Sequence, residues 1–101
     1  MQKDKRYKGI KSMIVTGTIT EFRQIFDQVP KSLIAQDIHA NNNRITKIID
    51  HPQLLTGEEM FILSDLLELE HTKIFELVYN QYSKEDKDKA PKQKKNLIKT
   101  D

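Results

Sequence analysis

The chain has 101 residues, which allows one domain at most, and its 37% apolar and 32% charged residues support only a modest core. The absence of cysteine excludes disulfides and thiolate metal sites and fits a reducing compartment, so we expect a cytoplasmic protein. No apolar run approaches the roughly 20 residues of a membrane helix, and no apolar stretch follows the basic N-terminus as it would in a secretory signal.

The net charge of +2 conceals an uneven distribution. Residues 1–12 carry five basic side chains against one acidic, and residues 83–101 carry seven lysines against four acidic side chains. Residues 13–82 hold five basic and ten acidic side chains. Cationic ends suit a polyanion such as nucleic acid, although charged ends can equally be no more than solvated. The segment 83–101 has too few apolar residues to offset chain entropy, so we expect a disordered lysine-rich tail.

Helical patterning begins in the basic N-terminal segment, residues 1–17. Apolar residues at helical spacing predict a leading helix over 5–16, and Gly17 suits a left-handed stop. Residues 18–21 fit a capping box that opens a second helix over 21–29. The apolar stripe of that second helix consists of Phe22, Ile25, Phe26 and Val29.

A pair of short helices is predicted next. Pro30 can start a helix but cannot lie inside one, so a helix is expected over 31–38. Residues 41–43, all asparagine, mark a turn and supply a cap for a following helix that ends before His51 and Pro52. Ala35 is small where the two helices must approach closely. The apolar contacts of the pair are expected from Ile34, Ile38, Ala40, Ile45 and Ile48.

Two further helices complete the pattern. A second capping box at 56–59 opens a leucine-rich helix, and a weak break near Glu70 separates it from a helix over 71–82. The alternation typical of strands is absent. The sequence therefore predicts an all-α fold of five or six helices, with the domain proper at residues 18–82.

The second helix of the central pair carries a polar stripe opposite its isoleucines. Asparagine can donate to and accept from the major-groove edge of adenine, threonine can contact either base type, and basic residues can neutralise phosphate or read guanine. Such contacts usually come from the N-terminal part of the helix. The stripe consists of Asn43, Thr46, Lys47 and Asp50, with Asn42 and Arg44 at its N-terminal end.

The segment PKSLIAQDIHANNNRITKIID resembles the helix-turn-helix of lambda-repressor-like, Cro-type regulators of bacteria and phages. The resemblance covers residues 18–82, because the flanking helices match that fold as well. It implies a compact domain that binds double-stranded DNA sequence-specifically in the major groove, regulates transcription and often forms a homodimer. The DNA-reading candidates by position are Asn42, Asn43, Arg44, Thr46 and Lys47. Lys31 and Ser32 would contact phosphates.

Two residues depart from the family pattern. His39 occupies a turn position that is usually glycine, and a residue with a Cβ must accept a strained or modified turn there, which histidine tolerates better than most. Ser64 stands where the later helix often has alanine. The acidic helices that follow Glu58 imply that their face points away from DNA.

Other interpretations remain open. The pair could be a plain helical hairpin, the chain a protein-interaction module such as an antitoxin-like partner binder, or its basic ends a nonspecific nucleic-acid or RNA binder. Tyr79 and Tyr82 could stack bases, or pack on a core edge or a dimer partner. The three histidines show no metal-ligand spacing, and the glutamates are better explained as caps and solvated faces. We expect no enzymatic activity, no cofactor and no small-molecule substrate, because no nucleophile–base pair or glycine-rich phosphate loop is visible.

Overall fold

The computed structural model describes residues 4–89, and the side chains of residues 4–84. Helices and connecting loops make up this part of the chain, with no strand in it, which confirms the predicted all-α class. No helix in the described range is long and apolar enough to cross a membrane. The elements are the α-helices α1 (Arg6–Val15), α2 (Lys31–Asp37), α3 (Asn42–Asp50), α4 (Gly57–Leu67) and α5 (His71–Lys89) and the 3-10 helices η1 (Phe22–Asp27) and η2 (Pro52–Leu54).

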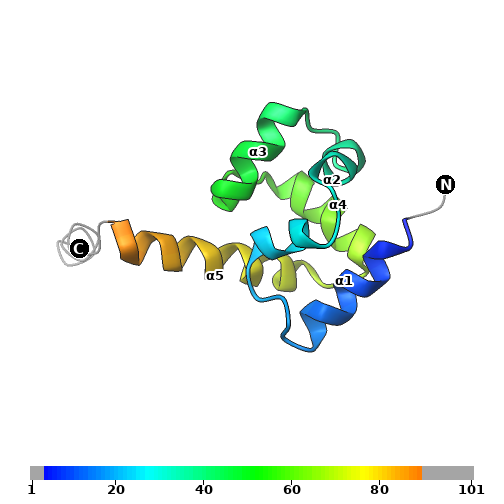
Figure 1. The fold of residues 1–101 in the computed structure, drawn as a ribbon, viewed down its shortest axis with the longest axis horizontal. Helices are drawn as coiled ribbons and strands as arrows, with labels where there is room; N and C mark the ends of the chain where they lie inside the picture. Colours follow the sequence, from blue (N-terminus) through cyan, green and yellow to red (C-terminus); the bar gives the residue numbers. More distant parts are fainter. Residues whose placement is uncertain (1–3, 90–101) are drawn as a thin grey trace.

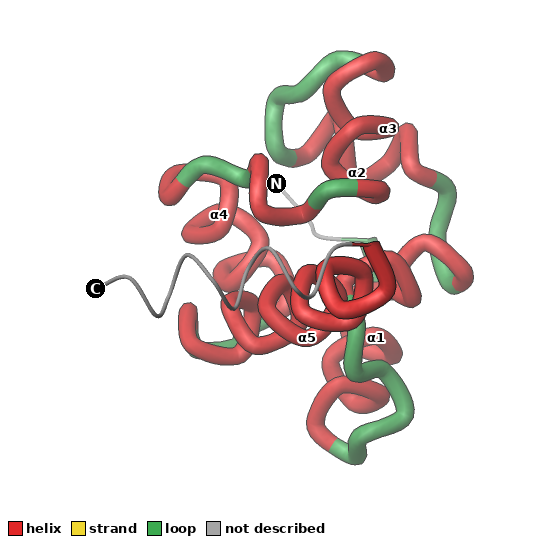
Figure 2. Tube along the Cα trace, turned by 90° about the vertical axis from the view of Figure 1, so that its left-hand side faces the viewer, coloured by secondary structure: helices red, strands yellow, loops and turns green. Residues whose placement is uncertain are grey.

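The short helices α2 and α3 lie together at one end of the molecule (Figure 1). The long helix α5 crosses the opposite side and extends beyond the body, and α1 lies beside the start of α5. Viewed at right angles, both α3 and α4 lie above α5, with α4 to its upper left and α3 to its upper right (Figure 2). The leading helix α1 packs on α4.

The leading helix ends as predicted. Gly17 has φ +86°, the left-handed conformation that terminates a helix without the penalty of a Cβ. The capping box predicted at residues 18–21 is wrong, because the cap lies three residues later. The side-chain oxygen of Gln24 accepts hydrogen bonds from the backbone N–H groups of Thr20 (2.8 Å) and Glu21 (2.9 Å). The helix predicted over 21–29 is correspondingly a shorter 3-10 helix, η1.

The predicted central pair is confirmed as α2 and α3. Asn41 is the cap of α3, and its side-chain oxygen accepts from the Arg44 backbone N–H at 2.8 Å. His39 has φ 64°, so a residue with a Cβ does adopt the left-handed turn that the family resemblance implied at this position. The single-turn 3-10 helix η2, which begins at Pro52, was not predicted.

The C-terminal helices begin where the sequence predicted. Thr56 and Glu59 form the expected capping box of α4, with the Thr56 hydroxyl accepting from the Glu59 backbone N–H (3.1 Å) and a Glu59 oxygen accepting from the Thr56 N–H (2.9 Å). The last helix was predicted to end at Tyr82, but α5 continues to Lys89, into the segment expected to be disordered. No glycine or proline interrupts residues 83–89, and extending an existing helix avoids the cost of a new nucleus. Residues 90–101 of the predicted tail lie outside the described residues.

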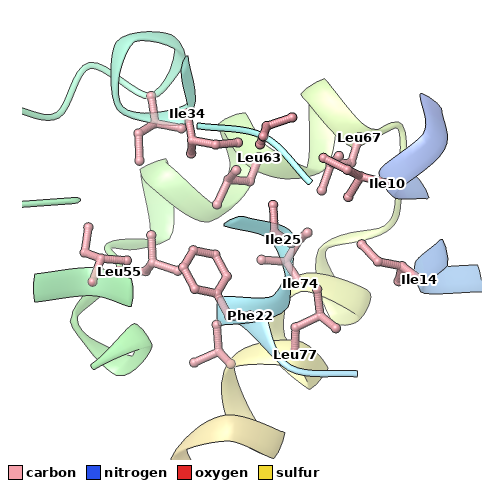
Figure 3. Close-up of a cluster of buried hydrophobic side chains, with 14 of the residues drawn as sticks. Ile10, Ile14, Phe22, Ile25, Ile34, Leu55, Leu63, Leu67, Ile74 and Leu77 are labelled. Carbon is pink, nitrogen blue, oxygen red and sulfur yellow. The ribbon is translucent and has the colours of Figure 1, made fainter. Parts of the chain in front are cut away.

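One apolar core joins the helices, including η1 (Figure 3). Phe22 and Ile25 of η1 lie at its centre beside Ile74 and Leu77 of α5. The expected contacts of the central pair are confirmed, since each of them is buried except Ala40, which is half-buried. Ala35, the small residue of the pair, is 3% exposed and so leaves no room for a larger side chain. These buried residues are Ile34, Ala35, Ile38, Ile45 and Ile48.

Candidate nucleic-acid interface

Helix α3 is amphipathic in the orientation that the sequence predicted. Ile45 and Ile48 are fully buried, and the polar stripe on the opposite side is exposed. The apolar side therefore anchors the helix, and the polar side can meet a partner without disturbing the core. The exposed polar residues of α3 are Asn42, Asn43, Thr46, Lys47 and Asp50.

Helix α2 adds two exposed residues to the same surface. The Lys31 ammonium donates to the Thr46 hydroxyl at 2.9 Å, and the same hydroxyl donates to the Asn42 carbonyl oxygen at 2.9 Å. These bonds place the start of α2 beside the first turn of α3, with the exposed Ser32 next to Lys31. We call this surface the α2–α3 polar face; it consists of Lys31, Ser32, Asn42, Asn43, Thr46 and Lys47.

Arg44, the remaining DNA-reading candidate, is paired with residues of α4 and η2. Its guanidinium donates to both carboxylate oxygens of Glu59 on α4, from Nε at 2.7 Å and from Nη2 at 2.6 Å. Nη2 also donates to the Leu54 carbonyl oxygen of η2 at 3.1 Å. This geometry is the bidentate pairing for which the guanidinium is suited. Arg44 thus ties α3 to α4 and η2 and does not belong to the α2–α3 polar face.

The ion pair favours the charged forms of both partners. Hydrogen bonds from Arg44 hold the pKa of the Glu59 carboxyl below its ordinary value, against the opposing effect of burial. The same hydrogen bonds raise the pKa of the Arg44 guanidinium. The carboxylate also accepts from the Thr56 backbone N–H, so one side chain caps α4 and holds α3.

A buried amide fixes the other end of α3. Gln81 of α5 is 0% exposed; its amide nitrogen donates to the Ile49 carbonyl oxygen at 2.7 Å, and its amide oxygen accepts from the Arg23 backbone N–H at 2.8 Å. Both polar atoms of this side chain are therefore satisfied. Gln81 links the end of α3 to α5 and to η1.

A third link holds α2 to the leading helix. The Tyr7 hydroxyl of α1 donates to Asp37 Oδ2 at 2.5 Å, next to the turn that joins α2 to α3. Burial, reinforced by this carboxylate, raises the pKa of the Tyr7 hydroxyl, which therefore stays protonated as a donor. The helical pair is thus held from α1, α4 and α5.

The charge of the α2–α3 polar face is modestly positive. Lys31 and Lys47 are its two cations, while Asp50 lies at the far end of α3 and Asp37 faces Tyr7. Within the described residues, no three histidine or acidic side chains gather closely enough to hold a metal ion.

Two residues that hold α3, Glu59 and Gln81, were not predicted to do so. Glu59 was recognised as a cap, but its pairing with Arg44 has no local signature, because the partners are 15 residues apart. The burial of Gln81 could have been predicted from its position in the sequence. It continues the helical spacing of Ile74, Leu77 and Val78, and a glutamine in such a register predicts a buried amide with specific partners.

Comparison with known proteins identifies no relative: no family model, no curated protein and no solved structure matches the chain.

Proposed function

We propose that this chain is a sequence-specific double-stranded DNA-binding protein of the lambda-repressor-like type, in which α2 and α3 form the helix-turn-helix and α3 enters the major groove. The observation that carries the proposal is the exposed polar side of α3, opposite two fully buried isoleucines and rigidly held by Arg44–Glu59 and Gln81. A rigid helix that presents amide, hydroxyl and ammonium groups together matches the chemistry of base edges and phosphates. The proposal includes a role in transcriptional regulation.

The dimensions of the pair suit this role. A helix of nine residues, the length of α3, is about 14 Å long. The major groove is about 12 Å wide and admits one helix. With α3 in the groove, the start of α2 would lie beside a phosphate strand, where Lys31 and Ser32 can donate to phosphate oxygens.

The residues of the α2–α3 polar face take different parts in the proposal. Asn42 and Asn43 are the adenine readers, since an asparagine amide can both donate to and accept from that base. Lys47, one turn beyond Asn43, is a phosphate contact. Thr46 contacts a thymine methyl or a backbone oxygen. Arg44 is assigned to positioning α3, because its guanidinium is already paired with Glu59.

The test begins with selection of bound duplexes from a random pool, followed by binding assays on the selected site and on scrambled DNA. We expect Asn43→Ala to lose about 1–3 kcal/mol of specific binding and to relax discrimination at one base pair. Its folding should be unchanged, because the cap of α3 is Asn41. We expect Lys47→Ala to weaken binding to both duplexes about equally and to reduce the salt slope by about one.

Lys73→Ala is the matched control, since Lys73 is an exposed lysine on α5 that pairs only loosely with Glu76 (3.5 Å). It should bind both duplexes like the parent protein. Parental affinity in both Asn43→Ala and Lys47→Ala would remove α3 from the recognition role. Tighter binding to single-stranded RNA than to any selected duplex would favour the nonspecific polyanion interpretation.

A further inference from the structure

Four neighbouring rings form an exposed stripe on α4 and α5. The ring centroids of Phe61 and His71 are 4.4 Å apart, and those of the stacked Phe75 and Tyr79 rings are 6.3 Å apart. His71, Phe75 and Tyr79 follow one another at intervals of four residues, so they lie along one side of α5. We call Phe61, His71, Phe75 and Tyr79 the aromatic stripe.

The aromatic stripe is not part of the core. Phe61, Phe75 and Tyr79 are 53%, 57% and 55% exposed, while Ile74 and Leu77 belong to the buried side of α5. Single exposed apolar residues are common, but large aromatic side chains in a contiguous exposed row mark an interaction surface. The stripe shares no residue with the α2–α3 polar face, and α5 crosses the side of the molecule opposite α2 and α3 (Figure 1).

Carboxylates flank the stripe on α4. Glu58, Phe61 and Asp65 are three and four residues apart and all exposed, so the two acidic side chains lie on the same side of α4 as the Phe61 ring. Residues 57–70 carry five acidic side chains and no lysine or arginine. This surface therefore repels a polyanion such as nucleic acid and attracts a cationic partner.

The lysines of α5 within the described side chains do not offset this charge, because each is paired with a carboxylate. The Lys73 ammonium lies 3.5 Å from a carboxylate oxygen of Glu76. The Lys84 ammonium lies 3.4 Å from a carboxylate oxygen of Glu21, the residue that caps η1. The side of α5 that carries Lys84 therefore faces η1, away from the aromatic stripe.

We propose that the aromatic stripe binds an extended, arginine-bearing segment of a partner protein. Two of its guanidinium groups stack on the Phe75 and Tyr79 rings, and a further basic side chain pairs with the carboxylates beside Phe61. This proposal does not depend on DNA binding.

The chemistry of the surface selects arginine. A guanidinium is planar and weakly hydrated, stacks on the face of an aromatic ring and pairs with carboxylates through two parallel hydrogen bonds. A lysine ammonium is a strongly hydrated point charge and offers no flat surface to a ring. A surface that combines exposed rings with carboxylates therefore favours arginine over lysine at equal charge.

The spacing of the rings selects an extended segment. The Phe75 and Tyr79 rings are nearly parallel, with 21° between their planes and 6.3 Å between their centroids. In an extended chain, alternate side chains point to the same face and are about 7 Å apart. Two arginines separated by one residue can therefore reach both rings, whereas adjacent arginines point to opposite faces.

The test uses the full chain and three labelled peptides of equal length and equal charge, with binding measured by fluorescence anisotropy. The first peptide alternates arginine with glycine, the second alternates pairs of arginines with pairs of glycines, and the third alternates lysine with glycine. Only the first and third place basic residues two positions apart. We expect the first peptide to bind roughly two- to fivefold more tightly than either of the others.

Variants of the full chain assign the binding to the stripe. Phe75→Ala and Tyr79→Ala should each weaken binding of the first peptide roughly two- to fivefold, while Val15→Ala, at a 62% exposed position on α1, should bind like the parent protein. Asp65→Asn should weaken binding of all three peptides and flatten its salt dependence. Asp27→Asn removes an equal charge from an exposed position on η1 and is its matched control. The helical circular dichroism of every variant should match that of the parent protein.

Four results would overturn the proposal. The first is equal affinity of the parent protein for the three peptides, which would indicate charge attraction alone. The second is parental affinity in both Phe75→Ala and Tyr79→Ala. The third is a single-stranded oligonucleotide that binds more tightly than the first peptide and is released by Phe75→Ala. The fourth is peptide binding that appears only when residues 90–101 are deleted, which would make the chain's own lysine-rich segment the occupant.

Discussion

The ion pair between Arg44 and Glu59 offers a direct test of how α3 is held. Replacing Glu59 by glutamine removes the negative charge but keeps a side chain that can still cap α4, because glutamine also serves at this position of a capping box. Replacing Arg44 by glutamine removes the other partner. Each variant should therefore report mainly on the ion pair itself.

The magnitude follows from the exposure of the two side chains. Hydrogen bonds to charged groups contribute roughly 1.5–3 kcal/mol, while fully exposed ion pairs contribute roughly 0.2–1 kcal/mol. The Glu59 side chain is 12% exposed and that of Arg44 is 37% exposed, so solvent screening reduces the first figure. We expect each single variant to lose about 1–2 kcal/mol of unfolding free energy, or about 4–16 °C in Tm for a domain of this size.

The double variant distinguishes positioning from DNA contact. If Arg44 acts through Glu59, the double variant should be about 1 kcal/mol more stable than the sum of the single losses predicts, measured by urea unfolding. Losses that add to within about 0.3 kcal/mol would show that the pair contributes nothing and would refute the assignment. An Arg44→Gln protein of parental stability that loses affinity for the selected duplex would instead make Arg44 a DNA contact.

Three further predictions concern stability. Ala35→Phe should lose about 1–3 kcal/mol through overpacking, and Ile48→Ala about 2–5 kcal/mol through a cavity, both measured by urea unfolding; parental stability in both would refute the packing described. The pKa of Glu59 is lowered in the folded protein, so its contribution to the free energy of unfolding is fully present above pH 4.5 and is lost as the pH falls through the lower pKa of the folded state. Glu59→Gln should therefore flatten the acid side of a plot of Tm against pH. His39→Gly should raise the free energy of unfolding by about 0.5–1 kcal/mol, because glycine adopts the left-handed turn without strain. Gly17→Ala should lower it by about 1–2 kcal/mol, because alanine is strained at this positive φ even though its Cβ would meet open space. Changes of the opposite sign in thermal melts would contradict this account of the two turns.

Local rules predicted the features that depend on near neighbours. The cap at Thr56 and the stop at Gly17 each follow from one residue type at one backbone position, whereas the left-handed turn at His39 was expected from the family resemblance. The buried and exposed sides of α3 follow from a period of 3.6 residues, so Ile45 and Lys47 were assigned correctly to opposite sides.

The capping box assigned to residues 18–21 was a local error, because Glu21 and Gln24 form it, and other errors lie where contacts between distant residues decide. The apolar spacing of residues 22–27 predicted an α-helix, but these residues form a 3-10 helix. Gln24 caps this helix, and the Arg23 backbone donates a hydrogen bond to Gln81 of α5. The role of Arg44 depended on Glu59, which is close only in the folded chain. Periodicity gives the side of a helix on which a residue lies, but it does not identify the partner that the residue meets there.

Gln81 has a consequence for how the domain opens. Its single amide serves the backbone of Arg23 on η1 and of Ile49 on α3, so the detachment of either segment leaves one of its buried polar atoms without a partner. Local opening of α3 alone is therefore costly, and fluctuations that release α3 should also release η1 from α5. In native-state hydrogen exchange, the amides of α3 and of η1 should belong to one cooperative unit with α5. Truncation of Gln81 to alanine should split that unit into separately exchanging segments.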